Sequence, residues 1–413
     1  MTQKLSAFLF ESEEDTVLTS IAVILLLGLL AGWLFAKMRL PSLMGMILVG
    51  MAISPHALDL VHESVLAVSP DLRQVALVII LTRAGLSLNL EDLRRVGRPA
   101  ALMCFVPACT EMLGTIALAP ALLGVSVLDA ALIGSVMAAV SPAVVVPRMI
   151  WLMDEGYGQE KRIPQLILAG ASVDDVFVIV VFTALTALAA TGEVSPASAL
   201  QIPVSIALGI ALGGAVGCAL TGFFRRNPMR DSVKVLIMLS VSFLLLEVEA
   251  RLKGVVPMSG LLAIMSMGIA VNQTDGALAK RLSAKYNKLW LGAEIFLFVL
   301  VGVAVNLHYA RKAGAAVVAL VALALCMRMA GVGLSLVKTG LNRRERLFCA
   351  VAYTPKATVQ AAIGTVPLAM GLACGEMVLT VAVISILLTA PFGAICIDHL
   401  HKRWLEKTAS PRA

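Results

Sequence analysis

The chain has 413 residues, of which 59% are hydrophobic and 14% are charged, and its formal net charge is +7. Soluble domains carry about 25% charged residues, so the composition excludes a water-soluble globular protein and indicates that lipid is the solvent. The basic excess does not indicate nucleic-acid binding, because the lysines and arginines lie mainly between apolar segments. The cysteines have no CxxC spacing and no nucleotide-binding glycine pattern stands out, so no cofactor is expected.

In chain order, the sequence predicts an all-α polytopic membrane protein with about 13 transmembrane helices, each built from about 20 mostly apolar residues. The predicted spans are 17–36, 42–58, 72–90, 99–121, 127–150, 164–190, 199–223, 233–250, 256–272, 288–307, 313–337, 346–370 and 376–399. The predicted connections are short, and none is long enough for a soluble domain.

The distribution of basic residues predicts the orientation. Lysine and arginine gather in the connections after odd-numbered spans and in the C-terminal tail, as at Arg94, Arg95, Arg343 and Arg344. Because cytoplasmic connections retain positive charge, we expect the N-terminus outside and the C-terminus in the cytoplasm. The expected location is the cell (inner) membrane.

Two predicted spans contain a proline preceded by a hydroxyl residue at similar depth. The fifth span has Ser141 and Pro142, and the twelfth has Thr354 and Pro355. Proline removes a helix hydrogen bond and disfavours helical geometry in the residue before it, so each span is expected to bend or break there. A simple kink is the alternative for either span alone.

Together, the two prolines predict an internal repeat. The two spans are seven apart, an odd number, so equivalent helices run in opposite directions. This suits inverted six-helix repeats over residues 17–190 and 233–399, joined by a linker helix at 199–223 and followed by a cytoplasmic tail at 400–413. In one class of secondary transporter, ions bind where the broken helices of such repeats cross at the membrane midplane.

Two adjacent aspartates, Asp174 and Asp175, lie about ten residues into the sixth span, or about 15 Å at 1.5 Å per residue. One charged side chain at that depth costs roughly 2.5–3.5 kcal/mol on insertion scales. Two neighbouring carboxylates in low dielectric resist being charged together. Such a pair can hold a proton, or release it and bind a cation, which predicts cation/proton exchange. A purely structural pair satisfied by salt bridges is the other interpretation.

Three more charges lie deep within predicted spans. Glu111 is in the fourth span and Arg328 in the eleventh, so they are repeat-related, and we expect an ion pair between them. This pair has either a structural role or an effect on the affinity of the aspartates. Lys356 follows the break in the twelfth span and is expected to offset the carbonyl ends of the half-helices, with snorkelling to the surface as the alternative.

Arg83 and Glu294 complete the set of charges within predicted spans. Arg83 lies towards the cytoplasmic side and is interpreted as a helix-packing or pathway charge. Glu294 lies near the cytoplasmic start of the tenth span, where it lines an access pathway or sits at the interface with water.

Three segments, AVSPAVVVPRM, GYGQEKRIPQLILAGASVDDVFVIVVF and YTPKATVQAAIG, resemble the NHA clade of cation:proton antiporters. This clade includes animal NHA-type sodium/hydrogen exchangers and bacterial relatives. The resemblance implies a homodimer with a mobile core domain and a dimerisation domain, working by elevator-like alternating access.

Carried over by motif, the resemblance implies that Asp174 and Asp175 bind the ion and the proton. Ser141 stands where another branch has an aspartate, and Thr354 offers a hydroxyl that supports the site. The same resemblance assigns Glu111, Arg328 and Lys356 to a charge network within the membrane.

The function expected is therefore secondary antiport of Na⁺ or Li⁺ against H⁺, with the two ions competing for the aspartate pair. K⁺/H⁺ antiport and sodium-coupled transport of an organic anion on the same fold are the alternatives. An intramembrane aspartyl enzyme is disfavoured, because adjacent residues on one helix point about 100° apart.

Overall fold

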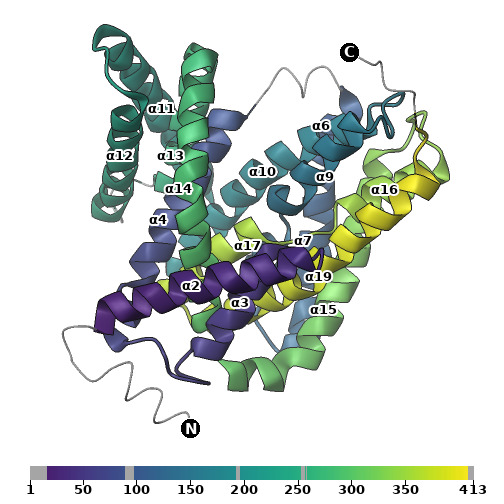
Figure 1. The fold of residues 1–413 in the computed structure, drawn as a ribbon, viewed down its shortest axis with the longest axis horizontal. Helices are drawn as coiled ribbons and strands as arrows, with labels where there is room; N and C mark the ends of the chain where they lie inside the picture. The colour runs from purple at the N-terminus through teal and green to yellow at the C-terminus, as the bar shows by residue number, and fades with distance from the viewer. Residues whose placement is uncertain (1–15, 89–96, 192–195, 253–255, 257, 408–413) are drawn as a thin grey trace. The chain divides into compact units, whose positions relative to one another are not determined.

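The computed structural model describes residues 16–88, 97–191, 196–252, 256 and 258–407. Within these ranges every regular element is a helix, apart from one isolated antiparallel bridge between Tyr157 and Lys407. The helices are drawn in Figure 1 with the labels used below. The expectation of an all-α membrane protein is confirmed.

The helices in chain order are α2 (Thr16–Lys37), α3 (Ser42–Ile53), α4 (Glu63–Ser87), α6 (Arg98–Met103), α7 (Val106–Leu123), α8 (Val127–Met137), α9 (Pro142–Asp154), α10 (Ile163–Thr191), α11 (Pro196–Arg226), α12 (Asp231–Leu252), α13 (Gly260–Thr274), α14 (Gly276–Val303), α15 (Leu307–Ser335), α16 (Arg343–Ala352), α17 (Thr358–Ile363), α18 (Val366–Ala369) and α19 (Gly375–Trp404).

The predicted number of spans is not confirmed. In the described part of the chain, nine helices are long and apolar enough to cross a membrane. Several of the other predicted spans fall on shorter apolar helices, such as α3 and α13. Helical structure nevertheless lies at the position of every predicted span, so the difference concerns the length and composition of the helices rather than their placement.

Two compact units divide the chain. The first contains residues 1–70, 90–178 and 295–413, and the second contains residues 71–89 and 179–294. Each unit draws on both halves of the sequence. The predicted repeats divide the chain by its internal sequence symmetry, whereas these units divide it by compactness. The boundaries of the repeats therefore stay predictions.

Close helix packing in each unit depends on glycine. In the first unit, Gly302 on α14 faces α3, and a Cβ added there would overlap Ile47 O and lie 2.9 Å from Met51 N. In the second unit, α11 and α13 lie side by side, and a Cβ at Gly213 would overlap the backbone of Ala263. The neighbouring atoms in both cases are backbone, so a larger residue would separate the helices.

The two predicted helix breaks are present in the first unit. The fifth predicted span is divided between α8 and α9, with Pro142 as the first residue of α9. The twelfth is divided between α16 and α17, with residues 353–357 outside both helices. Ser141 N donates to Pro355 O across 2.8 Å, so the two breaks are in direct contact.

Candidate functional site

Asp174 lies on α10 and is completely buried beside the first break. Its Oδ2 accepts hydrogen bonds from Val140 N at 2.8 Å and from Arg328 Nη2 at 2.9 Å. Val140 lies in the short non-helical segment just before α9, where backbone N–H groups have no partner within the helix. The carboxylate therefore supplies an acceptor that the broken helix needs.

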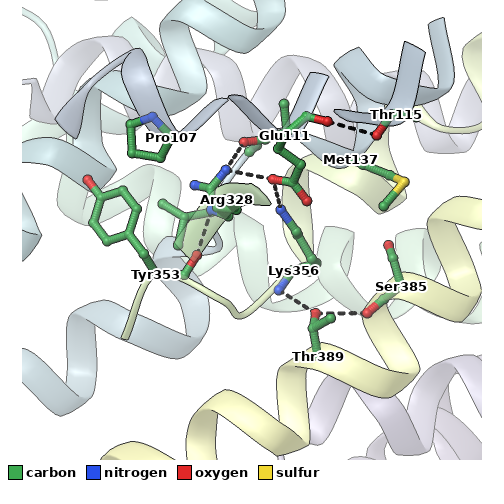
Figure 2. A network of polar contacts seen from close by, with 12 residues as sticks. Pro107, Glu111, Thr115, Met137, Arg328, Tyr353, Lys356, Ser385 and Thr389 are labelled. Atoms are coloured by element: carbon green, nitrogen blue, oxygen red, sulfur yellow. Dashed lines mark hydrogen bonds and ion pairs between the residues drawn. The ribbon is translucent and has the colours of Figure 1, made fainter. Parts of the chain in front are cut away.

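Arg328 on α15 donates to the backbone of both breaks. Its Nη1 donates to Ala138 O at the end of α8, and its Nε donates to Tyr353 O at the end of α16 across 2.6 Å. Figure 2 shows the guanidinium between Glu111 and Tyr353. The last carbonyls of a helix carry partial negative charge, so the cation stabilises the C-terminal ends of both half-helices.

The ion pair predicted between Glu111 and Arg328 is present, with Arg328 Nη1 2.9 Å from Glu111 Oε2. The same oxygen also accepts from Lys356 Nζ at 2.6 Å, as Figure 2 shows. All three side chains are fully buried. Glu111 thus joins two cations that would otherwise repel each other in a medium of low dielectric.

The expectation for Lys356 needs correction. From the sequence, the Lys356 ammonium was expected to offset the carbonyl ends of the half-helices. In the structure those carbonyls accept hydrogen bonds from Arg328, whereas Lys356 Nζ donates to Glu111. Arginine has five donors spread over a planar group, so one side chain reaches several acceptors that a single ammonium cannot.

Asp175 differs from its neighbour. It is 9% exposed, and in the part of the chain that the structure describes it has no ion pair. Its Oδ1 is buried without a hydrogen-bond partner. An uncompensated buried carboxylate is costly when charged, so a proton or a bound cation stabilises it.

The charged groups of Glu111, Asp174, Arg328 and Lys356, called the charged cluster below, comprise two anions and two cations. They compensate one another when all are ionised. Asp175 stands outside this balance, so its ionisation leaves one net negative charge.

Three buried oxygens of the predicted site residues have no hydrogen-bond partner among the described residues: Asp174 Oδ1, Asp175 Oδ1 and Ser141 Oγ. Hard monovalent cations bind such oxygen atoms, and buried polar atoms are normally satisfied. Thr354 is also buried, but its hydroxyl donates to Val351 O at 2.8 Å, in the last turn of α16. Of the two predicted supporting hydroxyls, Ser141 is the one without a partner.

Arg83 and Glu294 lie on α4 and α14 in the second unit. The guanidinium of Arg83 is 5.9 Å from the centre of the Trp290 ring, a cation–π distance. Glu294 interacts electrostatically with Arg83 and accepts a hydrogen bond from Trp290. The three side chains form a small polar group, which favours helix packing as one role of Arg83, and a role in an ion pathway stays a prediction.

Sequence reasoning missed Gln360, which is fully buried on α17 and hydrogen-bonded to both breaks. A long amide within the apolar run after Pro355 was the available signal, because a buried amide needs partners.

A compensated charge cluster at two broken helices, beside one uncompensated carboxylate, is the arrangement that the sequence predicts for an ion-binding site. Comparison with known proteins agrees. A family model described as the transmembrane sodium/hydrogen exchanger matches residues 22–402. Sodium/hydrogen exchanger 9B2 of Homo sapiens is 34% identical over 387 residues, which cover 89% of this chain and 70% of that protein.

Sodium/hydrogen exchanger 9B1 of Homo sapiens is 32% identical over 392 residues, covering 90% of this chain and 74% of that protein. Among solved structures, the sodium proton antiporter MjNhaP1 of Methanocaldococcus jannaschii has a TM-score of 0.81 at 18% identity, covering 98% of this chain and 99% of that chain. At that identity the likeness shows the fold alone. The chain belongs to the sodium/hydrogen exchanger family and is a transporter rather than an enzyme.

Proposed function

We propose that this protein exchanges Na⁺ or Li⁺ for H⁺ by alternating access, with the cation and the proton competing for Asp174 and Asp175. The observation that carries the proposal is the difference between the two carboxylates. Asp174 is held by Arg328 and Val140 N, whereas Asp175 has no ionic partner among the described residues. Asp175 is therefore the carboxylate that gains and loses the proton, and Asp174 is a fixed anionic ligand.

The unpaired oxygens support a bare cation as cargo. Asp174 Oδ1, Asp175 Oδ1 and Ser141 Oγ offer charge and lone pairs, and a dehydrated cation requires both. Binding of the cation and protonation of Asp175 both neutralise the same charge, so they exclude each other. An organic anion would meet a site whose unpaired groups are acceptors, which disfavours sodium-coupled anion transport.

The homodimer, the elevator-like movement, the N-terminus-outside orientation and the inner-membrane location form part of the same proposal. They rest on the motif resemblance and on the distribution of basic residues. Cross-linking in membranes and accessibility labelling of cysteines placed in the tail test the first and third of these.

The deciding experiment follows proton movement in proteoliposomes after addition of Na⁺, Li⁺ or K⁺. Wild-type protein should respond to Na⁺ and Li⁺, and Asp175→Asn should abolish the response. Asp398→Asn is the matched control, because Asp398 on α19 forms a partly exposed pair with Arg148 on α9, and this variant should keep normal exchange. Normal exchange by Asp175→Asn would exclude Asp175 as the proton carrier, and a response to K⁺ alone would favour K⁺/H⁺ antiport.

Thermal melting separates the two aspartates. Asp174→Asn removes one of the two carboxylates that pair with Arg328, which is fully buried. The melting temperature of this variant should therefore fall clearly below that of wild type. Asp175→Asn removes an uncompensated charge and should keep or raise the melting temperature, while losing the stabilisation that NaCl gives the wild type.

A further inference from the structure

One peptide group in the first break is held at both ends. The peptide joining Ala139 and Val140 offers the N–H of Val140 to Asp174 Oδ2 at 2.8 Å. Its carbonyl, Ala139 O, accepts from Gln360 Nε2 at 2.7 Å. Because both hydrogen bonds belong to a single planar unit, the position of Gln360 is transmitted directly to the donor that holds Asp174.

The other end of the Gln360 side chain is engaged in the second break. Its Oε1 accepts from Ala357 N at 2.8 Å, at the start of α17. Ala357 follows Lys356, whose ammonium binds Glu111. The Gln360 amide therefore connects the backbone of one broken helix, next to Lys356, to that of the other, next to the N–H that holds Asp174.

Two roles for Gln360 predict different contacts. A residue that only caps α17 needs its Oε1, which satisfies a free N–H at the helix start. The Nε2 group instead points to Ala139 O, with Met137 O further away at 3.5 Å. Hydrogen bonds in a chain polarise one another, so donation to Ala139 O strengthens donation from Val140 N to Asp174.

We propose that Gln360 is a positioning residue for the ion site, acting through the Ala139–Val140 peptide to fix the orientation of Asp174. The proposal rests on the proposed function, in which Asp174 is a ligand of the transported cation. Gln360 itself does not touch the cation. Its side chain is fully buried, so its contacts are not exchanged for contacts with bulk water.

The experiment compares Gln360→Met with Asn342→Ala in proteoliposomes. Met has a similar length and no hydrogen-bonding amide, so both connections are lost. Asn342 caps α16 through a hydrogen bond from Glu345 N at 2.9 Å, within the same unit. Its removal is the matched control, because it also weakens a helix start but does not alter the first break.

The measured quantities are the apparent KM for Na⁺ and the maximal rate. Both variants should melt below wild type and reduce the maximal rate in proportion to the folded protein that remains. Gln360→Met alone should raise the KM, by about 3- to 10-fold, the range expected for one lost hydrogen bond. A purely structural role changes the amount of active protein and leaves the KM where it was.

If Gln360→Met yields no folded protein, Gln360→Asn replaces it. This variant keeps both polar groups on a shorter side chain that reaches one break but not both, and it should also raise the KM. The positioning role is wrong if the folded Gln360 variant has the same KM for Na⁺ as wild type. It is also wrong if Asn342→Ala raises the KM by as much as the Gln360 variant does. Absence of Na⁺-driven proton movement in wild type overturns the proposed function, and this inference with it.

Discussion

Arg328 shows why an arginine rather than a lysine suits this position. Its guanidinium donates to two carboxylates, Glu111 and Asp174, and to two backbone carbonyls, Ala138 O and Tyr353 O. All three guanidinium nitrogens donate, Nε, Nη1 and Nη2, which a single ammonium could not reproduce. Arg328 thereby balances the charge of Asp174 while stabilising both helix ends.

Tyr353 lies against α10 at a glycine. The Arg328 guanidinium is 5.4 Å from the centre of the Tyr353 ring, and the Tyr353 hydroxyl is buried without a hydrogen-bond partner among the described residues. A Cβ at Gly170, one helical turn before Asp174, would overlap that hydroxyl. The small residue on α10 therefore provides the space for Tyr353, whose carbonyl accepts from Arg328.

We predict that Gly170→Ala displaces Tyr353 and destabilises the protein by roughly 1–3 kcal/mol, the usual cost of overpacking. Tyr353→Phe should be neutral or stabilising, because it removes an unsatisfied hydroxyl. The double variant should recover part of the loss, since the nearest ring carbon would be 3.2 Å from the new Cβ. Melting temperatures of the four proteins check this.

Gly214→Ala is the control for the change of glycine itself, because nothing lies within 4 Å of a Cβ at that position on α11. It should melt at or above the wild-type temperature, since alanine favours helix more than glycine does. A marked loss of stability in Tyr353→Phe would mean that the hydroxyl has a partner, and the steric argument would then be incomplete.

At the residue scale, the sequence predicted which charges are buried within the apolar segments but not all of their partners. The depth of Glu111 and Arg328 in apolar runs, and the equivalent places of their spans in the predicted repeats, were sufficient to predict their buried ion pair. The bond between Arg328 and Asp174 was not predicted, because their helices are far apart in sequence and nothing in either segment indicates which faces meet. The bonds of Gln360 were missed for the same reason.

Two helices at the breaks begin where local chemistry predicts. Pro142 begins α9, and Asn342 and Glu345 form a reciprocal capping box at α16. Local signals of this kind are readable in sequence, so both breaks could be predicted. The contact between them, from Ser141 N to Pro355 O, depends on tertiary packing and could only be inferred from the repeat.

Asp275 joins α13 to α14 and provides a test at this scale. Its Oδ1 accepts from Leu278 N at 2.9 Å, and Arg225 lies 3.6 Å from its other oxygen. The hydrogen bond from Leu278 N, with a further contribution from Arg225, lowers the pKa of Asp275 below its ordinary 3.8 despite the opposing effect of partial burial. The folded state therefore favours the charged carboxylate.

We predict that Asp275→Ala lowers the free energy of unfolding by about 1 kcal/mol at neutral pH, the usual value of a helix cap. A depressed pKa stabilises the fold above the unfolded-state value, and this stabilisation is lost as the pH falls through the folded-state value. The difference in unfolding free energy between Asp275→Ala and wild type should therefore become smaller below pH 3.8. Denaturation curves across this pH range measure it.

Asp275→Asn separates capping from charge. Its side-chain oxygen still accepts from Leu278 N, and it has no carboxyl group to titrate. It should keep most of the stability at neutral pH. A loss as large as that of Asp275→Ala would assign the effect to the interaction with Arg225 instead.

At the scale of the whole molecule, sequence symmetry and compactness divide the chain differently. The predicted repeats are consecutive halves, whereas each compact unit takes segments from both halves. All members of the charged cluster lie in the first unit, although Glu111 and Asp174 precede the linker helix and Arg328 and Lys356 follow it. Sequence periodicity predicts individual spans, but which spans share a unit depends on long-range contacts.

The charge balance of the cluster predicts an electroneutral cycle. Under the proposed function, Arg328 compensates Asp174 and only Asp175 exchanges its proton, so one cation replaces one proton. Solid-supported membrane recordings should therefore show no net transport current while a pH-sensitive dye reports exchange. A sustained Na⁺-dependent current that Asp175→Asn abolishes would mean that Asp174 also releases its proton during the cycle.

The pairing of Arg328 with Asp174 then decides which energy source the transporter can use. Membrane voltage is worth about 2.3 kcal/mol for each net charge moved through 100 mV, and an electroneutral cycle receives none of it. Each unit of pH difference, about 1.4 kcal/mol, sustains at most a roughly tenfold Na⁺ ratio. With such a cycle, a cell expels Na⁺ against an inward Na⁺ gradient only when its surroundings are more acidic than its cytoplasm. When the surroundings are more alkaline and Na⁺ is more concentrated outside, the same cycle admits Na⁺.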